Sequence, residues 1–332
     1  METLRYIAFR FLNFSLLVWV GVTLVFVLMR FIPVDPIEAL IGNLSTQGAS
    51  MSQEQMNAIR QSLTDAFGLE GTLWEQYWRF LSRNLLTFDF GVSFSSYPTT
   101  VNELIGRAMP WTIGLLISAA IIGWILGNVI GLFAGIYPRR RVSQIAEFLA
   151  LTLYPIPYYV LALLLSISFS YIIPIFPLSV TIRGDAWTLS FIWDVIYNSF
   201  LPALSIVIGV FGWWVISVKA LSSQVNQEEF VRFARLRSIP ERRVVSGYIL
   251  PNTLLPQITL LAIQIGLMFS GSILTEILFQ YPGLGLLLYS AVGQGDYNLM
   301  MGIIQVSIIA VAVATFLLDI FYPLLDPRVR YK

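Results

Sequence analysis

Long apolar stretches separated by polar segments dominate the pattern along the chain. Six of them lie near residues 9–30, 110–136, 146–173, 198–218, 254–279 and 299–325. About 20 mainly apolar residues are enough for a helix to cross a bilayer. The pattern therefore predicts an all-α, polytopic membrane protein with six transmembrane helices. The first stretch is longer than the core of a signal peptide, and no small-residue cleavage site follows it, so we expect it to remain as a span.

The basic residues between the spans predict the orientation. Fourteen of the 20 Lys and Arg residues fall on one side of the predicted membrane: Arg5, Arg10, Arg139, Arg140, Arg141, Lys219, Arg232, Arg235, Arg237, Arg242, Arg243, Arg328, Arg330 and Lys332. Because basic residues accumulate in cytoplasmic loops, both termini are predicted to be cytoplasmic. The expected location is the inner or plasma membrane, with several passes.

The spans divide the chain into four parts: an N-terminal tail with the first span (1–30), an extracytoplasmic loop (31–109), a transmembrane core that includes a cytoplasmic loop at 219–253 (110–325), and a cytoplasmic tail (326–332). The extracytoplasmic loop itself has helical patterns. Ser52 and Gln55 form a predicted capping box, and Met56, Ile59, Leu63 and Phe67 form a stripe that Gly68 can end. A second stripe consists of Trp74, Tyr77, Trp78, Leu81 and Leu85. These helices either pack as a small cap on the spans or offer a docking surface to an external protein.

Two spans contain residues that change helix packing. Gly123, Gly127, Gly131 and Gly135 recur every four residues, and such a ridge lets another helix approach closely, within the chain or in a partner. A hinge or a pore lining is the alternative. In the third span, Pro155 and Pro157 remove backbone donors, so they should bend or unwind its cytoplasmic end.

Composition excludes most familiar catalysis. Only 12% of the residues are charged, the net charge is +1, and the chain has no His and no Cys, so a soluble enzyme, a nucleic-acid binder and a thiolate or His metal site are all disfavoured. A phosphate-binding loop needs a Lys, and neither Lys219 nor Lys332 lies in one. The candidate membrane carboxylates are Glu147, Glu276 and Asp319, each better explained as a structural group than as a proton relay.

The polar segment 219–253 carries the most informative motif. Glu228 and Glu229 begin a short amphipathic helix, basic residues end it in agreement with the helix dipole, and Pro240 should stop it. Phe230, Phe233, Ala234 and Arg237 are expected on one face. The helix either inserts into a cytoplasmic partner or lies on anionic lipid.

The motifs resemble one family over nearly the whole chain. The matching segments are Glu229-Phe-Val-Arg-Phe-Ala-Arg, Leu254-Leu-Pro, Arg30-Phe-Ile-Pro-Val-Asp-Pro, Gln76-Tyr-Trp-Arg-Phe-Leu, Asp89-Phe-Gly-Val-Ser, Glu276-Ile-Leu-Phe-Gln-Tyr-Pro-Gly-Leu-Gly and Leu325-Asp-Pro-Arg-Val-Arg-Tyr. The chain resembles the first-subunit permeases of the dipeptide/oligopeptide/nickel branch of binding-protein-dependent ABC importers. Where this family usually has Gly after the docking helix, the chain has Ser238, which leaves the geometry of that turn open.

The resemblance implies a type I ABC importer permease with no catalytic or metal site. It implies that an ATPase contacts Glu229, Phe230, Arg232, Phe233, Ala234, Arg235 and Ser238. It also implies, as partners, a homologous second permease, two cytoplasmic ATPases that carry ATP and Mg²⁺, and an extracytoplasmic solute-binding protein. The expected cargo is an oligopeptide, with an oligosaccharide or a nickel chelate as alternatives. A secondary transporter is a remote alternative, because no deep charge or repeat supports it.

Glu276 and the turn Pro282-Gly283-Leu284-Gly285 are predicted to form a gate-like connection after the fifth span. Non-helical backbone at that depth must be satisfied by protein, so Glu276 should accept hydrogen bonds from backbone or Arg donors. The sequence does not identify the residues that contact the cargo.

Overall fold

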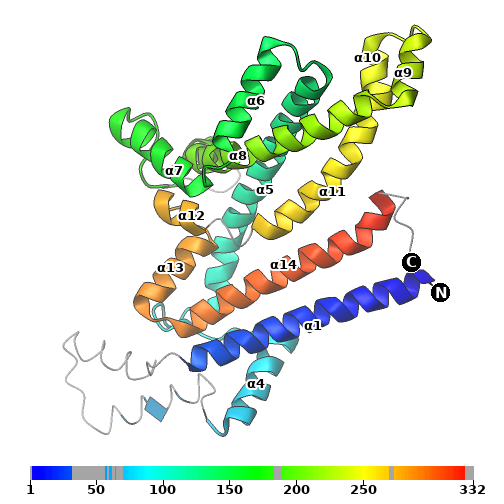
Figure 1. Cartoon of the computed structure of the whole chain (residues 1–332). Helices are drawn as coiled ribbons and strands as arrows, with labels where there is room; N and C mark the ends of the chain where they lie inside the picture. The colour runs from blue at the N-terminus through cyan, green and yellow to red at the C-terminus, as the bar shows by residue number, and fades with distance from the viewer. Residues whose placement is uncertain are drawn as a thin grey trace. The chain divides into compact units, whose positions relative to one another are not determined.

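The computed structural model describes residues 2–31, 57, 60–61, 64, 70–182, 188–268 and 273–325. Over these residues the structure is helical, with one isolated antiparallel bridge between Val92 and Thr100. The helices, in chain order, are α1 (Glu2–Arg30), α4 (Leu73–Leu86), α5 (Val101–Ile136), α6 (Arg141–Leu153), α7 (Tyr158–Ser166), η1 (Ile167–Ile172), α8 (Leu189–Asn226), α9 (Glu229–Leu236), α10 (Glu241–Val244), η2 (Val245–Ile249), α11 (Leu250–Met268), α12 (Ile273–Phe279), α13 (Leu284–Gln294) and α14 (Tyr297–Leu325) (Figure 1). The predicted capping box at Ser52, the stripe from Met56 to Phe67 and the tail from residue 326 lie outside the described residues.

The described residues contain five helices that are long and apolar enough to cross a membrane, and six if α6 and α7 form one bent span. The predicted all-α class is confirmed, and the number of candidate spans equals the six predicted when α6 and α7 are counted as one span. The chain divides into two compact units: the first contains residues 1–7, 112–282 and 314–332, and the second contains residues 8–111 and 283–313.

In the first unit, the glycine ridge of α5 packs directly against α8 of the same chain. A Cβ atom added at Gly123 would lie 2.6 Å from Val210 Cγ2, and one at Gly127 would lie 2.2 Å from Trp214 Cβ. At Gly135 the added atom would lie 2.7 Å from the backbone oxygen of Lys219. Real Cβ atoms do not approach other atoms so closely, so glycine is what allows this contact. The predicted close packing is therefore made within the chain, and the ridge is not a free surface for a partner.

The third predicted span is broken where its two prolines lie. α6 ends at Leu153 and α7 begins at Tyr158, and the two helices meet at an angle of 98°. Pro157 precedes α7 as its N-cap, with an extended ψ of 136°. The missing backbone donors of Pro155 and Pro157 explain the break, which is sharper than a simple bend.

In the second unit, α4 packs against α1 and α14 through one face. Leu81 is buried with Val18, Val22 and Ala312, while Tyr77 and Leu85 pack at the margin of this cluster. Thr72 and Glu75 form a reciprocal capping box that begins α4. The second predicted stripe thus packs on neighbouring spans, and its two Trp side chains remain exposed.

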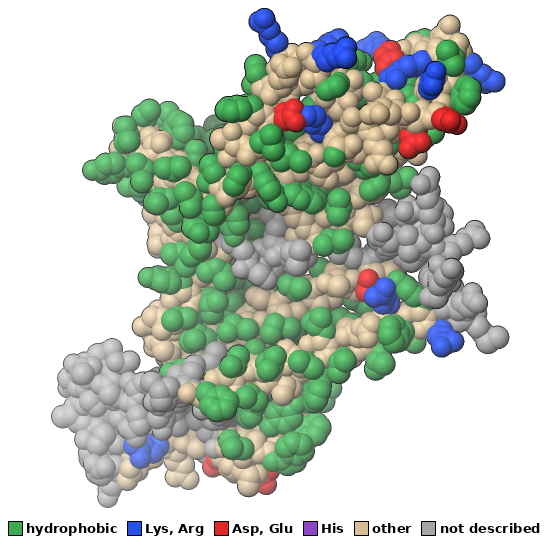
Figure 2. All heavy atoms as spheres, in the orientation of Figure 1, with side chains coloured by type: hydrophobic (Ala, Val, Ile, Leu, Met, Phe, Trp, Pro, Cys, Tyr) green, Lys and Arg blue, Asp and Glu red, His purple; other side chains and the backbone are tan. Residues whose placement is uncertain are grey.

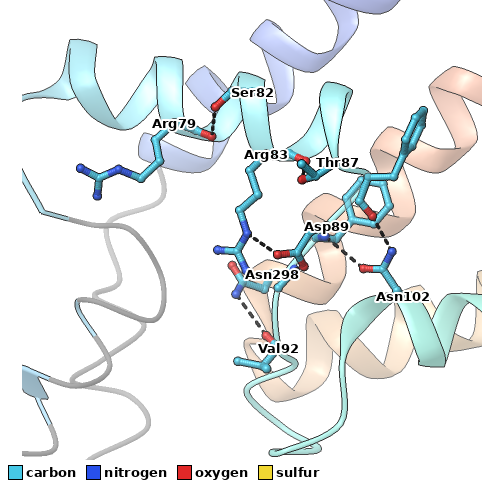
Figure 3. Close-up of polar contacts among 11 residues, drawn as sticks. Arg79, Ser82, Arg83, Thr87, Asp89, Val92, Asn102 and Asn298 are labelled. Carbon is cyan, nitrogen blue, oxygen red and sulfur yellow. Dashed lines mark hydrogen bonds and ion pairs between the residues drawn. The ribbon is translucent and has the colours of Figure 1, made fainter.

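The loop between α4 and α5 is held by polar contacts at both of its ends. Arg83 Nε donates to Asp89 Oδ2 over 2.8 Å, and Asn102 Nδ2 donates to the Phe88 oxygen. Asn298, from α14, donates to the Val92 oxygen over 3.1 Å. These contacts are drawn in Figure 3 and fix the course of residues 87–92.

The buried carboxylate of Asp296 completes the anchoring of this loop. Its Oδ2 accepts from the hydroxyls of Ser93 and Ser95 and from the Ser95 backbone N–H, the last over 2.9 Å. Its Oδ1 accepts from the Leu299 N–H over 3.0 Å at the start of α14. A carboxylate buried this deeply is stable only because these donors replace its hydration.

Candidate functional site

The motif predicted to dock a partner forms α9, a helix of two turns between α8 and α10. Glu228 is its N-cap, with an extended ψ of 148°, and Glu229 lies in the first turn. Arg235 lies in the last turn, so the charges match the helix dipole at both ends, as the sequence predicted. Such a short helix is not stable alone and must be held by tertiary contacts.

One face of α9 is buried in the first unit. Val231 and Ala234 lie in a cluster with Ile136, Val225, Val244 and Ile249, from α5, α8, α10 and η2. These two small side chains let α9 lie close to the helices beneath it. The prediction that Ala234 contacts a partner therefore does not hold for this structure, because Ala234 is covered by its own chain.

The opposite face of α9 is apolar and open. Phe230 is 40% exposed, Phe233 61% and Leu236 70%. Sequence reasoning identified the two Phe residues but missed Leu236, although the three-residue spacing from Phe233 to Leu236 could have indicated it. Three large apolar side chains on a polar surface form a patch suited to insertion into a groove.

Arg235 joins α9 to its neighbours. Its Nη2 donates to Glu241 Oε1 over 2.8 Å and to Asn226 Oδ1 over 2.6 Å, and its Nε donates to Glu241 Oε2 over 3.2 Å. The hydrogen bonds to Glu241 raise the pKa of Arg235 above its ordinary value, so this side chain stays charged. Arg235 therefore holds the helix on the bundle, while Arg232, which is exposed, is available at the rim.

Ser238 adopts the left-handed conformation that the sequence left open. Its φ is +55°, and its N–H donates to the Arg235 oxygen over 2.9 Å. The next residue, Ile239, donates to the Ala234 oxygen over 3.3 Å. The turn thus caps α9 as a glycine would, at a cost of roughly 1 kcal/mol for a residue with a Cβ.

Basic side chains gather around α9 at one end of the first unit. Figure 2 shows Lys and Arg over α9, α10 and the turn between α5 and α6. In that turn, the Arg140 guanidinium lies 4.6 Å from the centroid of the Tyr137 ring. Lys219 of α8 forms an ion pair with Glu147 of α6. Glu147 is therefore a partner in a structural ion pair.

Of the predicted gate residues, Glu276 and Pro282 belong to the first unit, and Gly283 and Gly285 belong to the second. Glu276, on α12, is fully buried and accepts a hydrogen bond from the Thr112 hydroxyl over 2.9 Å. The backbone N–H of Tyr281 donates to the backbone carbonyl oxygen of Glu276 over 2.8 Å. The Thr112 hydroxyl is a donor to this carboxylate that the sequence did not predict.

Gly283 is the N-cap of α13 and Gly285 is buried within it, while Pro282 is exposed. Asp319, the third candidate carboxylate, lies half-buried on α14, and its backbone oxygen accepts from the Tyr6 hydroxyl over 3.0 Å. Among the described residues, no group of three or more His, Cys, Asp or Glu side chains could hold a metal ion.

Comparison with known proteins agrees with this arrangement. Residues 127–331 match the model of a family described as "Binding-protein-dependent transport system inner membrane component". The chain is also 27% identical over 329 residues, 99% of its own length and 100% of theirs, to the glutathione transport system permease proteins GsiC of Escherichia coli strain K12 and Shigella dysenteriae serotype 1. The expected type I permease fold and the membership of an ABC importer are confirmed. The chain belongs to the family of binding-protein-dependent transport system inner membrane components.

Proposed function

We propose that this permease carries oligopeptides across the membrane as one half of a translocation pathway. The relatives with matching length are permeases of glutathione transport systems, and glutathione is a small peptide. Peptide cargo is therefore favoured over an oligosaccharide or a nickel chelate, which no observation on this chain supports. The expected partners are a homologous second permease and an extracytoplasmic binding protein that delivers the cargo.

We propose that α9 couples ATP hydrolysis on the ATPase to movement of the spans. The main support is the exposed apolar face of this helix. Phe230, Phe233 and Leu236 fill a groove of an ATPase, and Glu229 and Arg232 fix the orientation at its rim. Because Arg235 and the buried face tie α9 to α8, α10 and η2, movement of the ATPase is transmitted to the spans. ATP and Mg²⁺ bind to the ATPases and not to this chain.

The orientation follows from the same site. The basic residues around α9 support a cytoplasmic location for this helix, and we propose that both termini lie on the same side. The turn Pro282-Gly283-Leu284-Gly285 and Glu276 then lie toward the outside. There Glu276 has a structural role in a gate, since its carboxylate needs a protein donor at that depth.

The test is Phe233→Asp in the assembled transporter. A charge in the apolar patch should abolish cargo-stimulated ATP hydrolysis and uptake, while the circular dichroism and thermal unfolding of the chain stay unchanged. Gln224→Asp is the matched control, because Gln224 is exposed near the end of α8 and the substitution adds the same charge outside the patch. Normal uptake in Phe233→Asp would remove α9 as the coupling element.

A further inference from the structure

The exposed surface of α4, in the second unit, has two different sides. Trp74 and Trp78 are 66% and 51% exposed, and their spacing of four residues places them on one side of the helix. Glu75 and Arg79 are also exposed. Each of these two follows a Trp by one position, so the charged pair lies about 100° further round the helix. We call Trp74 and Trp78 the aromatic side of α4, and Glu75 and Arg79 its charged side.

The two Trp side chains are held in a cluster with Tyr77. The ring centroids of Trp74 and Trp78 lie 5.6 Å apart, with an angle of 89° between the ring planes. The Tyr77 ring lies 5.9 Å from each of them. These contacts fix the two indole rings on α4 and still leave at least half of each exposed. Large apolar side chains that are exposed together in this way mark an interaction surface.

Tyr77 gives the cluster a defined depth along α1. Its hydroxyl lies 2.8 Å from the Thr23 hydroxyl, and its ring centroid lies 5.4 Å from that of Phe26. The apolar stretch of α1 runs from Arg5 to Leu28, so Thr23 lies about 7.5 Å before its end at a rise of about 1.5 Å per residue. Helices that lie in a membrane surface insert their apolar side by about 5–10 Å. The cluster is therefore at the depth where Trp and Tyr anchor membrane proteins.

The surface of α1 next to this contact is exposed and apolar. Trp19 and Val27 lie about one turn on either side of Thr23, and they are 46% and 40% exposed. Figure 2 shows hydrophobic side chains over both α1 and α4. The aromatic side of α4 thus continues the exposed surface of a membrane span. A soluble protein would have to reach into the bilayer to cover it, whereas lipid is already present there.

We propose that α4 is an interfacial anchor, whose aromatic side inserts into the lipid leaflet at the C-terminal end of α1. An indole suits this position because its ring is apolar, while its N–H can donate to a headgroup or to water. The charged side stays in water and among the headgroups, and it prevents deeper insertion. Because α4 packs on α1 and α14, the anchor holds these spans at a fixed depth. The inference does not depend on the cargo of the permease.

Spin labels on single introduced cysteines test the anchor, since the chain has no Cys of its own. Trp78→Cys places a label on the aromatic side. Arg79→Cys is the matched control, because it is the adjoining exposed position and lies on the charged side. The assembled transporter is reconstituted into vesicles of phosphatidylethanolamine and phosphatidylglycerol. The measurement is the collision rate of each label with oxygen, which concentrates in lipid, and with a nickel chelate, which stays in water.

We expect the label at residue 78 to collide more often with oxygen than with the nickel chelate. The label at residue 79 should show the opposite order. Both orders should stay the same when the external binding protein is added. If Trp78→Cys does not assemble, Trp74→Cys decides by the same criteria, because it lies on the same side of α4.

Three results overturn the inference. More frequent collisions with the nickel chelate at residue 78 would show that the aromatic side faces water. Protection of that label from both reagents would show that protein covers it. Protection that develops only after the binding protein is added would make the aromatic side a docking surface for that protein and not for lipid.

Discussion

The contact between α5 and α8 gives the most quantitative prediction, through Gly127→Ala. The new Cβ would lie 2.2 Å from Trp214 Cβ, 3.2 Å from its Cγ and 3.3 Å from its Cα. Carbon atoms pack at about 3.5–4.0 Å, so α8 has to move away by more than about 1 Å. Trp214 cannot turn aside to relieve the clash, because the atoms that meet the new methyl group are at the base of its side chain.

The expected cost combines two opposing terms. Overpacking of this kind costs about 1–3 kcal/mol, and replacement of Gly by Ala inside a helix returns about 0.8–1.0 kcal/mol. We expect a net loss of up to about 2 kcal/mol. For a unit of this size, that corresponds to a fall of up to roughly 8 °C in the unfolding temperature.

Gly114→Ala is the control on the same helix. A Cβ at Gly114 meets nothing within 4 Å, so this variant gains helix propensity without a clash and should unfold at the same or a higher temperature. The measurement is thermal unfolding of the purified chain in detergent, followed by circular dichroism. If Gly127→Ala is as stable as Gly114→Ala, the packing of α5 on α8 described above is wrong.

Three further predictions concern single turns and pairs. Ser238→Gly should relieve the strain of the left-handed conformation and stabilise α9 by about 1 kcal/mol. The expected result is a higher unfolding temperature with normal ATP coupling. A lower unfolding temperature would contradict the left-handed cap at residue 238. Glu276→Gln should weaken the hydrogen bond from the Thr112 hydroxyl and lower both thermal stability and uptake. If neither changes, the charge of Glu276 has no structural role. The hydrogen bond from Arg83 lowers the pKa of Asp89 below its ordinary value of 3.8. This pair therefore contributes stability above pH 3.8 and loses it as the pH falls through the lowered pKa. The unfolding temperature of Asp89→Asn should lie below that of wild type at about pH 7, and the difference should shrink as the pH falls through the lowered pKa.

The sequence predicted the elements whose cause is local. Apolar length predicted the spans, Pro155 and Pro157 predicted the break between α6 and α7, and the charges predicted the ends of α9. The four-residue glycine spacing predicted close packing but not its partner, because spacing on one helix says nothing about which helix faces it. Ala234 was misplaced for the same reason, since helical position alone did not reveal the cluster beneath α9.

Side-chain contacts between different helices and loops could not be predicted. The role of Arg235 depends on Asn226 and Glu241 folding back on either side of it. Asp296 was not singled out at all, because its donors Ser93 and Ser95 lie about 200 residues earlier.

The anchoring of the 87–100 loop by Asp296 has a consequence for biosynthesis. Ser95 and Asp296 are separated by 201 residues, and a ribosome adds roughly 5–20 residues per second. The loop therefore leaves the ribosome about 10–40 s before the carboxylate that holds it is made. During that interval the two serine hydroxyls lack their acceptor, and the loop is an accessible target for proteases. The loop can be protected only after residue 296 has been synthesised, so its resistance to proteases reports whether synthesis of the permease has passed the fifth predicted span.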